Sequence, residues 1–296
     1  MNGILCIDKP QHMTSFDCCA LLRRLTGEKK VGHAGTLDPM ATGVLPLMFG
    51  KATRAIPLLP THRKCYRAEV QFGLTSDTLD VWGTVSQTGK PYPTLAEIEA
   101  VVPQFTGDIL QVPPMMSALK KDGVRLYDLA RQGIEIEREA RPVTIYALTI
   151  EAYDQPKGLL TLTCDCSAGT YIRTLCDDMG QALGCGAVLN SLRRTAAAGY
   201  ELSACLTIEQ CRALAEQGAL LDHVLPTETA FEIYKVLTVT KPQATRFQNG
   251  GDLAAERLPI TLTEGETVRV NAPDGEFIGL GQLEQQSLRI LRIFKE

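Results

Sequence analysis

Residues 31–43 read VGHAGTLDPMATG, and most of what the sequence predicts starts from this segment. Its glycines and Pro39 are incompatible with a continuous helix or strand, so we expect a loop of fixed shape before the apolar run Val44 to Phe49. Taken alone, Asp38-Pro39 is an ordinary turn pair in which the carboxylate bonds locally. The surrounding glycines instead favour a carboxylate held on a rigid loop that a ligand can approach closely. Asp38 is therefore our first candidate for catalysis.

The rest of the first 230 residues predicts a mixture of strands and helices. Alternating or continuous apolar runs predict strands over residues 3–10, 65–72, 143–152 and 159–166. Three helices are expected: one capped by Thr14 or Ser15, one opened by the capping box Thr94–Glu97, and one over residues 170–183. The apolar side of the first helix is expected to consist of Phe16, Cys19, Leu22 and Leu25. This mixture indicates an α+β fold with long antiparallel-type strands.

The last part of the chain has a different pattern. After about residue 230, short strands alternate with Gly, Pro and Asp turns, which predicts a small, separate β barrel. A chain of 296 residues exceeds the usual size of one domain. We therefore expect a large domain over residues 1–232 and a small one over residues 233–296.

The composition indicates a folded protein, with 45% hydrophobic and 22% charged residues. No run approaches 18 apolar residues, and residues 1–10 lack a basic leader, so we expect no membrane span and a cytoplasmic location. The ten cysteines contain no C-x-x-C pair. We expect buried, reduced thiols and no metal site.

The distribution of charge indicates where a polyanion would bind. The net charge of −4 argues mildly against a nucleic-acid partner, but residues 1–75 carry +5, residues 76–200 carry −4 and residues 201–296 carry −5. A polyanion should therefore lie mainly against the N-terminal portion. The alternative is a solvated surface without a partner.

Several segments together resemble one enzyme family. GHAGTLDPMATGVLP at residues 32–46 is similar to the catalytic motif of the TruB family of pseudouridine synthases. The segments that also resemble this family, in the expected order, are Lys9-Pro10, KCYRAEVQFG, PPMMSALKKDGVRLYDLARQG, EREARPVTIY, SAGTYIRTLCDDMGQALG and LRRT. The resemblance covers essentially the whole chain. It implies a pseudouridine synthase fold with a mixed or antiparallel sheet and flanking helices, closed by a PUA-like RNA-binding barrel.

The resemblance also implies an activity. The expected enzyme isomerises uridine 55 in the T-arm of tRNA to pseudouridine, without a cofactor, a metal or a guide RNA, and we expect a monomer. Its catalytic residues are expected to be Asp38, Tyr66 and Arg173. The residues expected to contact the substrate are His33, Lys9, Leu192 and Lys120. Met116 stands where the family usually has an aromatic residue.

The residues support parts of this assignment independently. Arg173 falls in the first turn of a predicted helix, where the helix dipole disfavours a cation, so a nearby carboxylate or phosphate is expected. Asp38 is our candidate, and the alternative is an i,i+4 pair with Asp177. For Tyr66 the alternative is a core residue, and for His33 it is a turn residue.

A uridine in a stacked T-arm hides C1′ and C5, so the base has to flip into a pocket at a cost of a few kcal/mol. Phosphate contacts would offset that cost. The candidate basic clusters, each of which could also be solvated surface, are Arg23-Arg24, Lys29-Lys30, Arg63-Lys64, Lys120-Lys121 with Arg125, and Arg193-Arg194.

The reaction needs one anion, which attacks covalently or stabilises positive charge on the ribose. The sequence leaves open whether Asp38 attacks C1′, attacks C6 or acts as a base. It also leaves two other classes open: a relative that modifies ribosomal RNA within a guide-RNA particle, and a non-catalytic protein that opens or folds the tRNA elbow.

Overall fold

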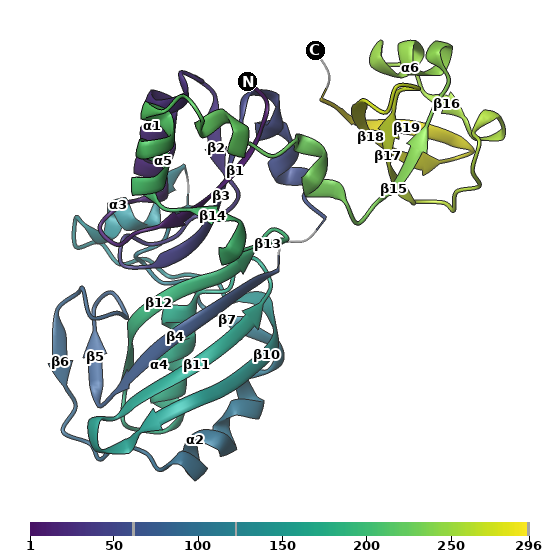
Figure 1. Cartoon of the computed structure of the whole chain (residues 1–296). Helices are drawn as coiled ribbons and strands as arrows, with labels where there is room; N and C mark the ends of the chain where they lie inside the picture. Colours follow the sequence, from purple (N-terminus) through teal and green to yellow (C-terminus); the bar gives the residue numbers. More distant parts are fainter. Residues whose placement is uncertain (61–62, 122, 295–296) are drawn as a thin grey trace.

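Two separate sheets organise the chain (Figure 1). The computed structural model describes residues 1–60, 63–121 and 123–294. The larger sheet, with helices on its faces, contains ten of the strands up to Leu206, and two short hairpins in the same part of the chain form two-stranded sheets of their own. The smaller sheet begins at Lys235 and is drawn in yellow and green at the C-terminal end of the molecule.

The large sheet has the order β14-β1-β3-β12-β4-β11-β10-β7, with β13 beside β12 and β2 beside β3. Its strands are β1 Gly3–Lys9, β2 Val31–His33, β3 Thr42–Phe49, β4 Lys64–Phe72, β7 Gly107–Gln111, β10 Arg141–Asp154, β11 Leu159–Cys166, β12 Ala187–Ala197, β13 Tyr200–Glu201 and β14 Cys205–Leu206. Only the β1–β14 and β12–β3 pairs are parallel in the described sheet. The predicted α+β class with a mixed, mainly antiparallel sheet is confirmed.

Strand β4 shows why the central strands form. Tyr66, Ala68, Val70 and Phe72 alternate with more exposed residues, so that one face of the strand enters the core. Helix α4 (Ile172–Ala182) packs on that core through its apolar side. Gly180 permits close approach, because a Cβ there would lie 2.1 Å from the amide nitrogen of Ala187 on β12. Helix α2 (Leu95–Val101) adds Ile98 to the same core.

Another core lies where α1 (Ser15–Thr26) and α5 (Ile208–Glu216) pack on β1 and β3. Thr14 caps α1, and its capping box with Asp17 is complete. The helix start is therefore confirmed, but the predicted apolar side is wrong at Phe16, which is 63% exposed. The buried side consists of Ser15, Cys18, Cys19, Leu21 and Leu22.

The loop predicted over residues 31–43 is partly wrong. Val31–His33 form strand β2, which pairs antiparallel with β3 from Phe49 to Leu47. The remainder, up to Ala41, is irregular as expected. The described cysteines are all free, and only Cys65 and Cys205 are half-buried rather than buried.

The remaining elements of the described chain are short. The strands are β5 Leu74–Ser76, β6 Val85–Gln87, β8 Lys120–Lys121 and β9 Val124–Arg125, and the helix is α3 Leu126–Ala130. The 3-10 segments are η1 Gly50–Leu58, η2 Val102–Phe105, η3 Gln155–Lys157, η4 Leu202–Ala204, η5 Leu220–His223, η6 Thr227–Phe231 and η7 Ala255–Arg257.

The small sheet has the order β15-β17-β18-β19-β16. Its elements are β15 Lys235–Thr238, helix α6 Lys241–Gln248, β16 Leu253–Ala254, β17 Thr267–Asn271, β18 Phe277–Glu284 and β19 Ser287–Ile293. It encloses its own core around Phe247. The sequence did not predict α6, which lies between β15 and β16.

The two sheets contact each other through an aromatic cluster. The ring of Phe231 lies 5.7 Å from that of Phe294 and 6.2 Å from that of Phe277, between centroids. Arg269 Nη1 also lies 3.1 Å from Glu228 Oε1. Among the described residues, no helix is long and apolar enough to cross a membrane.

Candidate active site

Asp38 lies on the loop between β2 and β3 and forms an ion pair with Arg173. Arg173 Nε donates to Asp38 Oδ2 at 2.9 Å, and the Asp38 side chain is 36% exposed, against 4% for Arg173. The predicted pair is confirmed. The alternative partner, Asp177, instead accepts a hydrogen bond from Gln181 Nε2 at 2.6 Å.

All three guanidinium nitrogens of Arg173 are fixed. Nη1 donates to the carbonyl of Thr78 at 3.0 Å, and Nη2 donates to the carbonyl of Met116 at 2.8 Å. Because a guanidinium is planar and rigid, these bonds set the direction of Nε and hence the position of the Asp38 carboxylate. Met116 thus takes part in the site through its backbone.

A second carboxylate, Asp80, was missed by the sequence reasoning. Its Oδ2 lies 3.8 Å from Arg173 Nε, and its Oδ1 accepts from Thr78 Oγ1 at 2.7 Å and from the Trp82 amide at 3.0 Å. Asp80 is buried and lies after β5, far from Asp38 in the sequence. No local spacing could reveal it, because only the fold brings both carboxylates to one arginine.

A cavity of about 260 Å³ opens beside this network. It brings together four of the predicted site residues, Asp38, Tyr66, Arg173 and Leu192, and it is also lined by Lys64 and Tyr171 from β4 and the start of α4. Tyr66 is buried on β4, and this burial raises its pKa to about 12. The phenol of Tyr66 is therefore neutral at physiological pH.

The predicted contacts Lys9 and His33 lie outside this lining. Lys9 is completely buried, and its Nζ donates to the carbonyls of Pro10 and Met13 at 2.8 and 2.7 Å. In this structure Lys9 therefore holds the turn before α1 and presents no amine to a ligand. Burial lowers its pKa to about 8. The side chain of Lys120 lies outside the described residues.

His33 lies on β2 and is half-buried. Burial, with the Arg194 charge, lowers its pKa. Its Nδ1 is buried and has no hydrogen-bond partner among the described residues. This buried nitrogen does not face the cavity lining, and the contact of His33 with a nucleotide stays a prediction.

Arg194 holds the catalytic loop from behind. It is completely buried, and it donates to the carbonyls of Val44 at 2.7 Å, Thr36 at 3.3 Å and Gly35 at 3.2 Å. A Cβ on Gly43, whose φ is +106°, would lie 2.1 Å from the Arg194 carbonyl oxygen, so this contact requires glycine. The prediction that Arg194 grips phosphate is wrong, because the side chain does not reach solvent.

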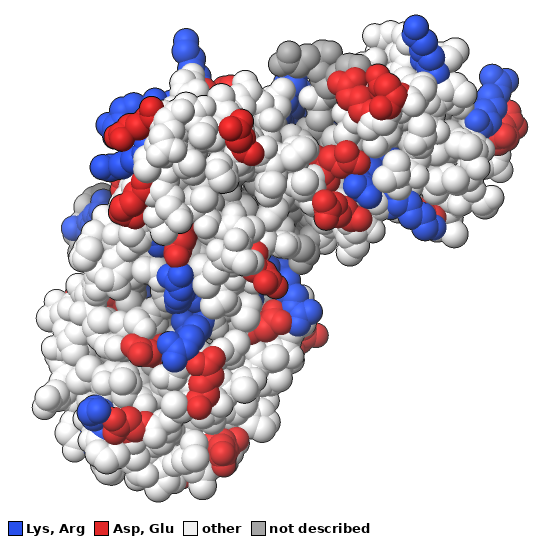
Figure 2. Space-filling model, in the orientation of Figure 1, with Lys and Arg blue, Asp and Glu red and all other residues white. Residues whose placement is uncertain are grey.

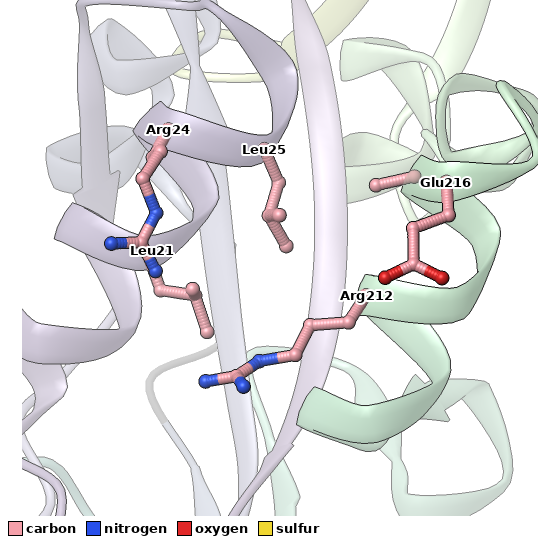
Figure 3. A pocket seen from close by; sticks show the side chains of 6 residues that line it. Leu21, Arg24, Leu25, Arg212 and Glu216 are labelled. Atoms are coloured by element: carbon pink, nitrogen blue, oxygen red, sulfur yellow. The ribbon is translucent and has the colours of Figure 1, made fainter.

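Surface charge is mixed on the face shown in Figure 2, where acidic and basic side chains are interspersed over the large sheet and several basic ones gather around α1. A second cavity, of about 420 Å³, lies between α1 and α5 (Figure 3). It is lined by Leu21, Arg24, Leu25, Arg212, Ala215 and Glu216. None of the predicted site residues lines it, so the smaller cavity at Asp38 is the candidate active site.

Solved structures agree with this fold. A crystal structure of a Cbf5–Nop10–Gar1 complex has a TM-score of 0.76 at 24% identity, over 99% of this chain and 85% of the other. An H/ACA RNP bound to a substrate RNA containing 2′-deoxyuridine has a TM-score of 0.75 at 22% identity, with the same coverage. At this identity the likeness establishes the fold.

Sequence comparisons define the class as pseudouridylate synthase. The model described as TruB family pseudouridylate synthase (N terminal domain) matches residues 23–172, and that of the tRNA pseudouridylate synthase B C-terminal domain matches residues 173–232. The chain belongs to the TruB family. A protein named tRNA pseudouridine synthase B from Clostridium acetobutylicum is 39% identical over 293 residues, 99% of each chain. One of the same name from Dechloromonas aromatica is 43% identical over 284 residues, 95% of this chain and 91% of the relative.

Proposed function

We propose that this protein isomerises uridine 55 in the T-arm of tRNA to pseudouridine, with Asp38 as the essential carboxylate. Family membership and full-length similarity to proteins named tRNA pseudouridine synthase B support the reaction and the substrate. The observation that carries the proposal is the Asp38–Arg173 pair at 2.9 Å, facing a cavity that Tyr66 also lines.

The reaction exchanges one bond for another at C1′. The C1′–N1 bond of the uridine breaks, the uracil turns and a C1′–C5 bond forms. C5 then loses its proton and N1 takes one up, so the product is an isomer of the substrate. No electron is gained or lost overall. Whether the carboxylate attacks C1′, attacks C6 or removes a proton, it must be ionised and aimed at the nucleotide. Arg173 pairs with this carboxylate and aims it through its fixed guanidinium plane.

Tyr66 contributes as a neutral phenol. With a pKa of about 12 it does not act as a phenolate base at physiological pH. Its ring offers a face for the uracil, and its hydroxyl can donate a hydrogen bond or relay the C5 proton to another acceptor. Leu192, 8% exposed in the same lining, supplies an apolar contact. We assign substrate contacts to His33 and Lys120 as well.

The cavity also fixes how the substrate must arrive. A uridine inside a T-arm cannot reach a buried site while stacked, so its base is flipped out of the RNA at a cost of a few kcal/mol. Contacts with the rest of the tRNA offset that cost. The N-terminal part, with its excess of basic residues, is the surface that we assign to the tRNA backbone.

We also propose a division into a catalytic domain of residues 1–232 and a PUA-like RNA-binding domain of residues 233–296. The second family match ends at residue 232, and the small sheet with its own core begins at Lys235, which supports this boundary. The protein acts on tRNA in the cytoplasm, as a monomer and without a guide RNA.

A tritium-release assay tests the proposal. The purified protein is incubated, without added cofactors, with unmodified tRNA tritiated at uracil C5. We expect release from the T-arm uridine alone, its abolition by Asp38→Asn, and unchanged release by Asp222→Asn, an exposed carboxylate in η5. Binding of tRNA without release by the wild-type protein would instead establish a non-catalytic RNA-binding protein or one that needs a guide RNA.

A further inference from the structure

An exposed aromatic pair lies beside the catalytic network. The rings of His12 and Trp82 are stacked, with centroids 4.9 Å apart and an angle of 23° between their planes. Trp82 nevertheless keeps 46% of its surface exposed, and His12 is exposed as well. Tryptophan is on average largely buried, so a tryptophan fixed on the surface is unusual.

Backbone hydrogen bonds tie both residues to the network. The His12 amide donates to the carbonyl of Pro39, the residue after Asp38, at 2.9 Å. The Trp82 amide donates to Asp80 Oδ1 at 3.0 Å, and Asp80 contacts Arg173. The stacked pair therefore joins the turn before α1 to the loop that carries Asp80. On the His12 side, the hydrogen bond reaches the residue next to Asp38.

The backbone of His12 has an uncommon conformation. Its φ is +66°, a left-handed conformation that non-glycine residues rarely adopt. A glycine would take this conformation without strain, but it would leave the indole of Trp82 without its stacking partner. Residues held in such conformations gather at ligand sites, where the surrounding structure maintains the strain.

We propose that His12 and Trp82 form a platform on which one unpaired base of the substrate RNA stacks while the target uridine occupies the cavity. This inference rests on the proposed function, because it places the RNA at Asp38. Nucleobases present a flat π-face and stack on aromatic side chains whatever their sequence. A base next to a flipped uridine has lost a stacking neighbour, and the platform replaces it.

The chain contains a single tryptophan, so its fluorescence reports on this platform directly. In the Asp38→Asn protein, which does not turn over, we expect a T-arm hairpin RNA to quench the emission of Trp82. We then compare hairpins that each lack one loop base. For one of these hairpins the quench should disappear, although filter retention shows that the hairpin still binds. Unchanged emission at saturating RNA, or a quench that every abasic hairpin retains, would overturn the platform.

Steady-state kinetics supply an independent readout. Trp82→Ala should raise KM about tenfold with kcat within about twofold, and Trp82→Phe should restore most of the loss. A purely structural role in placing Asp80 predicts the reverse, a fall in kcat transmitted through Arg173. Tyr92→Ala is the matched control and should leave KM and kcat unchanged. Tyr92 is 41% exposed and packs on Gly73 and Gly158, at the end of β4 away from Tyr66.

The two proposals fail differently. Absence of tritium release by the wild-type protein would overturn the proposed function. Normal release by the wild-type protein, together with an unchanged KM in Trp82→Ala, would overturn the platform alone.

Discussion

Two arginines hold the Asp38 carboxylate and its loop in different ways. Arg173 contacts the Asp38 side chain directly, whereas Arg194 binds the backbone carbonyls of the loop on which Asp38 lies. The first arginine orients the reacting group, and the second fixes the loop. The two roles differ, because among the described residues Arg194 makes no ion pair with Asp38 and contacts only the backbone of its loop.

We expect Arg194→Met to lower the free energy of unfolding by about 2–4 kcal/mol. The substitution removes the donor from one buried and two partly buried hydrogen bonds to carbonyl oxygens. Each buried loss costs about 1–3 kcal/mol and the others less, partly offset because a buried charge is also removed. The neighbouring Arg193→Met is the control. Arg193 is 41% exposed and pairs with Asp8 at 2.7 Å, so its loss should cost at most about 1 kcal/mol. Denaturant unfolding measures both, and equal losses would contradict the assigned role.

Lys9 should make stability depend on pH in the alkaline range. Burial lowers its pKa from 10.5 to about 8 in the folded protein, so the buried charge is unfavourable below about pH 8. Between about pH 8 and 10.5 the unfolded chain binds this proton and the folded one does not. The stability of the wild-type protein relative to Lys9→Met should therefore rise with pH in this window, by at most about 1.4 kcal/mol per pH unit. Parallel stability curves for the two proteins would show that Lys9 does not titrate in this way.

Residues differ in how far the sequence predicts them. The Asp38–Arg173 pair follows from a cation in the first turn of a helix, which needs a carboxylate nearby. Asp80 and Arg194 carry no such signal. Asp80 reaches Arg173 because its loop forms a bridge with Leu189 of β12. The sequence predicts Arg194 at the surface, because buried and exposed arginines have the same sequence pattern.

At the scale of elements, α1 depends on its cap. Thr14 Oγ1 accepts from the Asp17 amide at 3.0 Å, and Asp17 Oδ2 accepts from the Thr14 amide at 2.8 Å. We expect Thr14→Ala to cost about 1 kcal/mol in thermal or denaturant unfolding, and Thr14→Ser to cost much less. A loss in Thr14→Ser as large as that in Thr14→Ala would assign the effect to the methyl group instead.

The same cap makes stability rise with pH, as Lys9 does, but in the acid range. The bonds from Thr14 lower the pKa of Asp17 below its usual 3.8. The stabilisation by the carboxylate is therefore complete above about pH 3.8 and disappears as pH falls through the lowered pKa. The free energy of unfolding of Asp17→Asn should therefore be lower than that of the wild-type protein near neutral pH, and the two should become equal in acid.

The elements that the sequence predicts best are those with a local cause. The capping boxes at Thr14 and Thr94, the alternation in β4 and the apolar side of α4 all follow from spacing alone. Strand β2 does not, because three residues become a strand only by pairing with β3. Phe16 fits the helical period but lies at the margin of the buried side, where it packs against Arg23 instead.

At the scale of the molecule, the aromatic cluster around Phe231 connects the two sheets. Phe231 belongs to η6 in the connecting segment and is completely buried between residues of both. The sequence predicts the change of pattern near residue 230, but not this contact, because connecting segments show no period that assigns their side chains to a core.

We expect Phe231→Ala to destabilise the protein by about 3–5 kcal/mol, the range for deleting a buried aromatic ring. Phe16→Ala removes the same atoms from an exposed site and should change stability by no more than about 0.5 kcal/mol. Denaturant unfolding compares the two directly. A small effect of Phe231→Ala would mean that the two sheets are held together mainly by polar contacts such as Arg269–Glu228.

The order of strands has a consequence for folding during translation. Strand β12 lies between β3 and β4, so it joins the group that carries Asp38 to the group that carries Tyr66. Until residues 187–197 emerge, a nascent chain holds these two groups as unconnected sheets with exposed edges, which are prone to stick to other chains. Asp38 and Tyr66 can therefore be held in one sheet only after β12 has been synthesised.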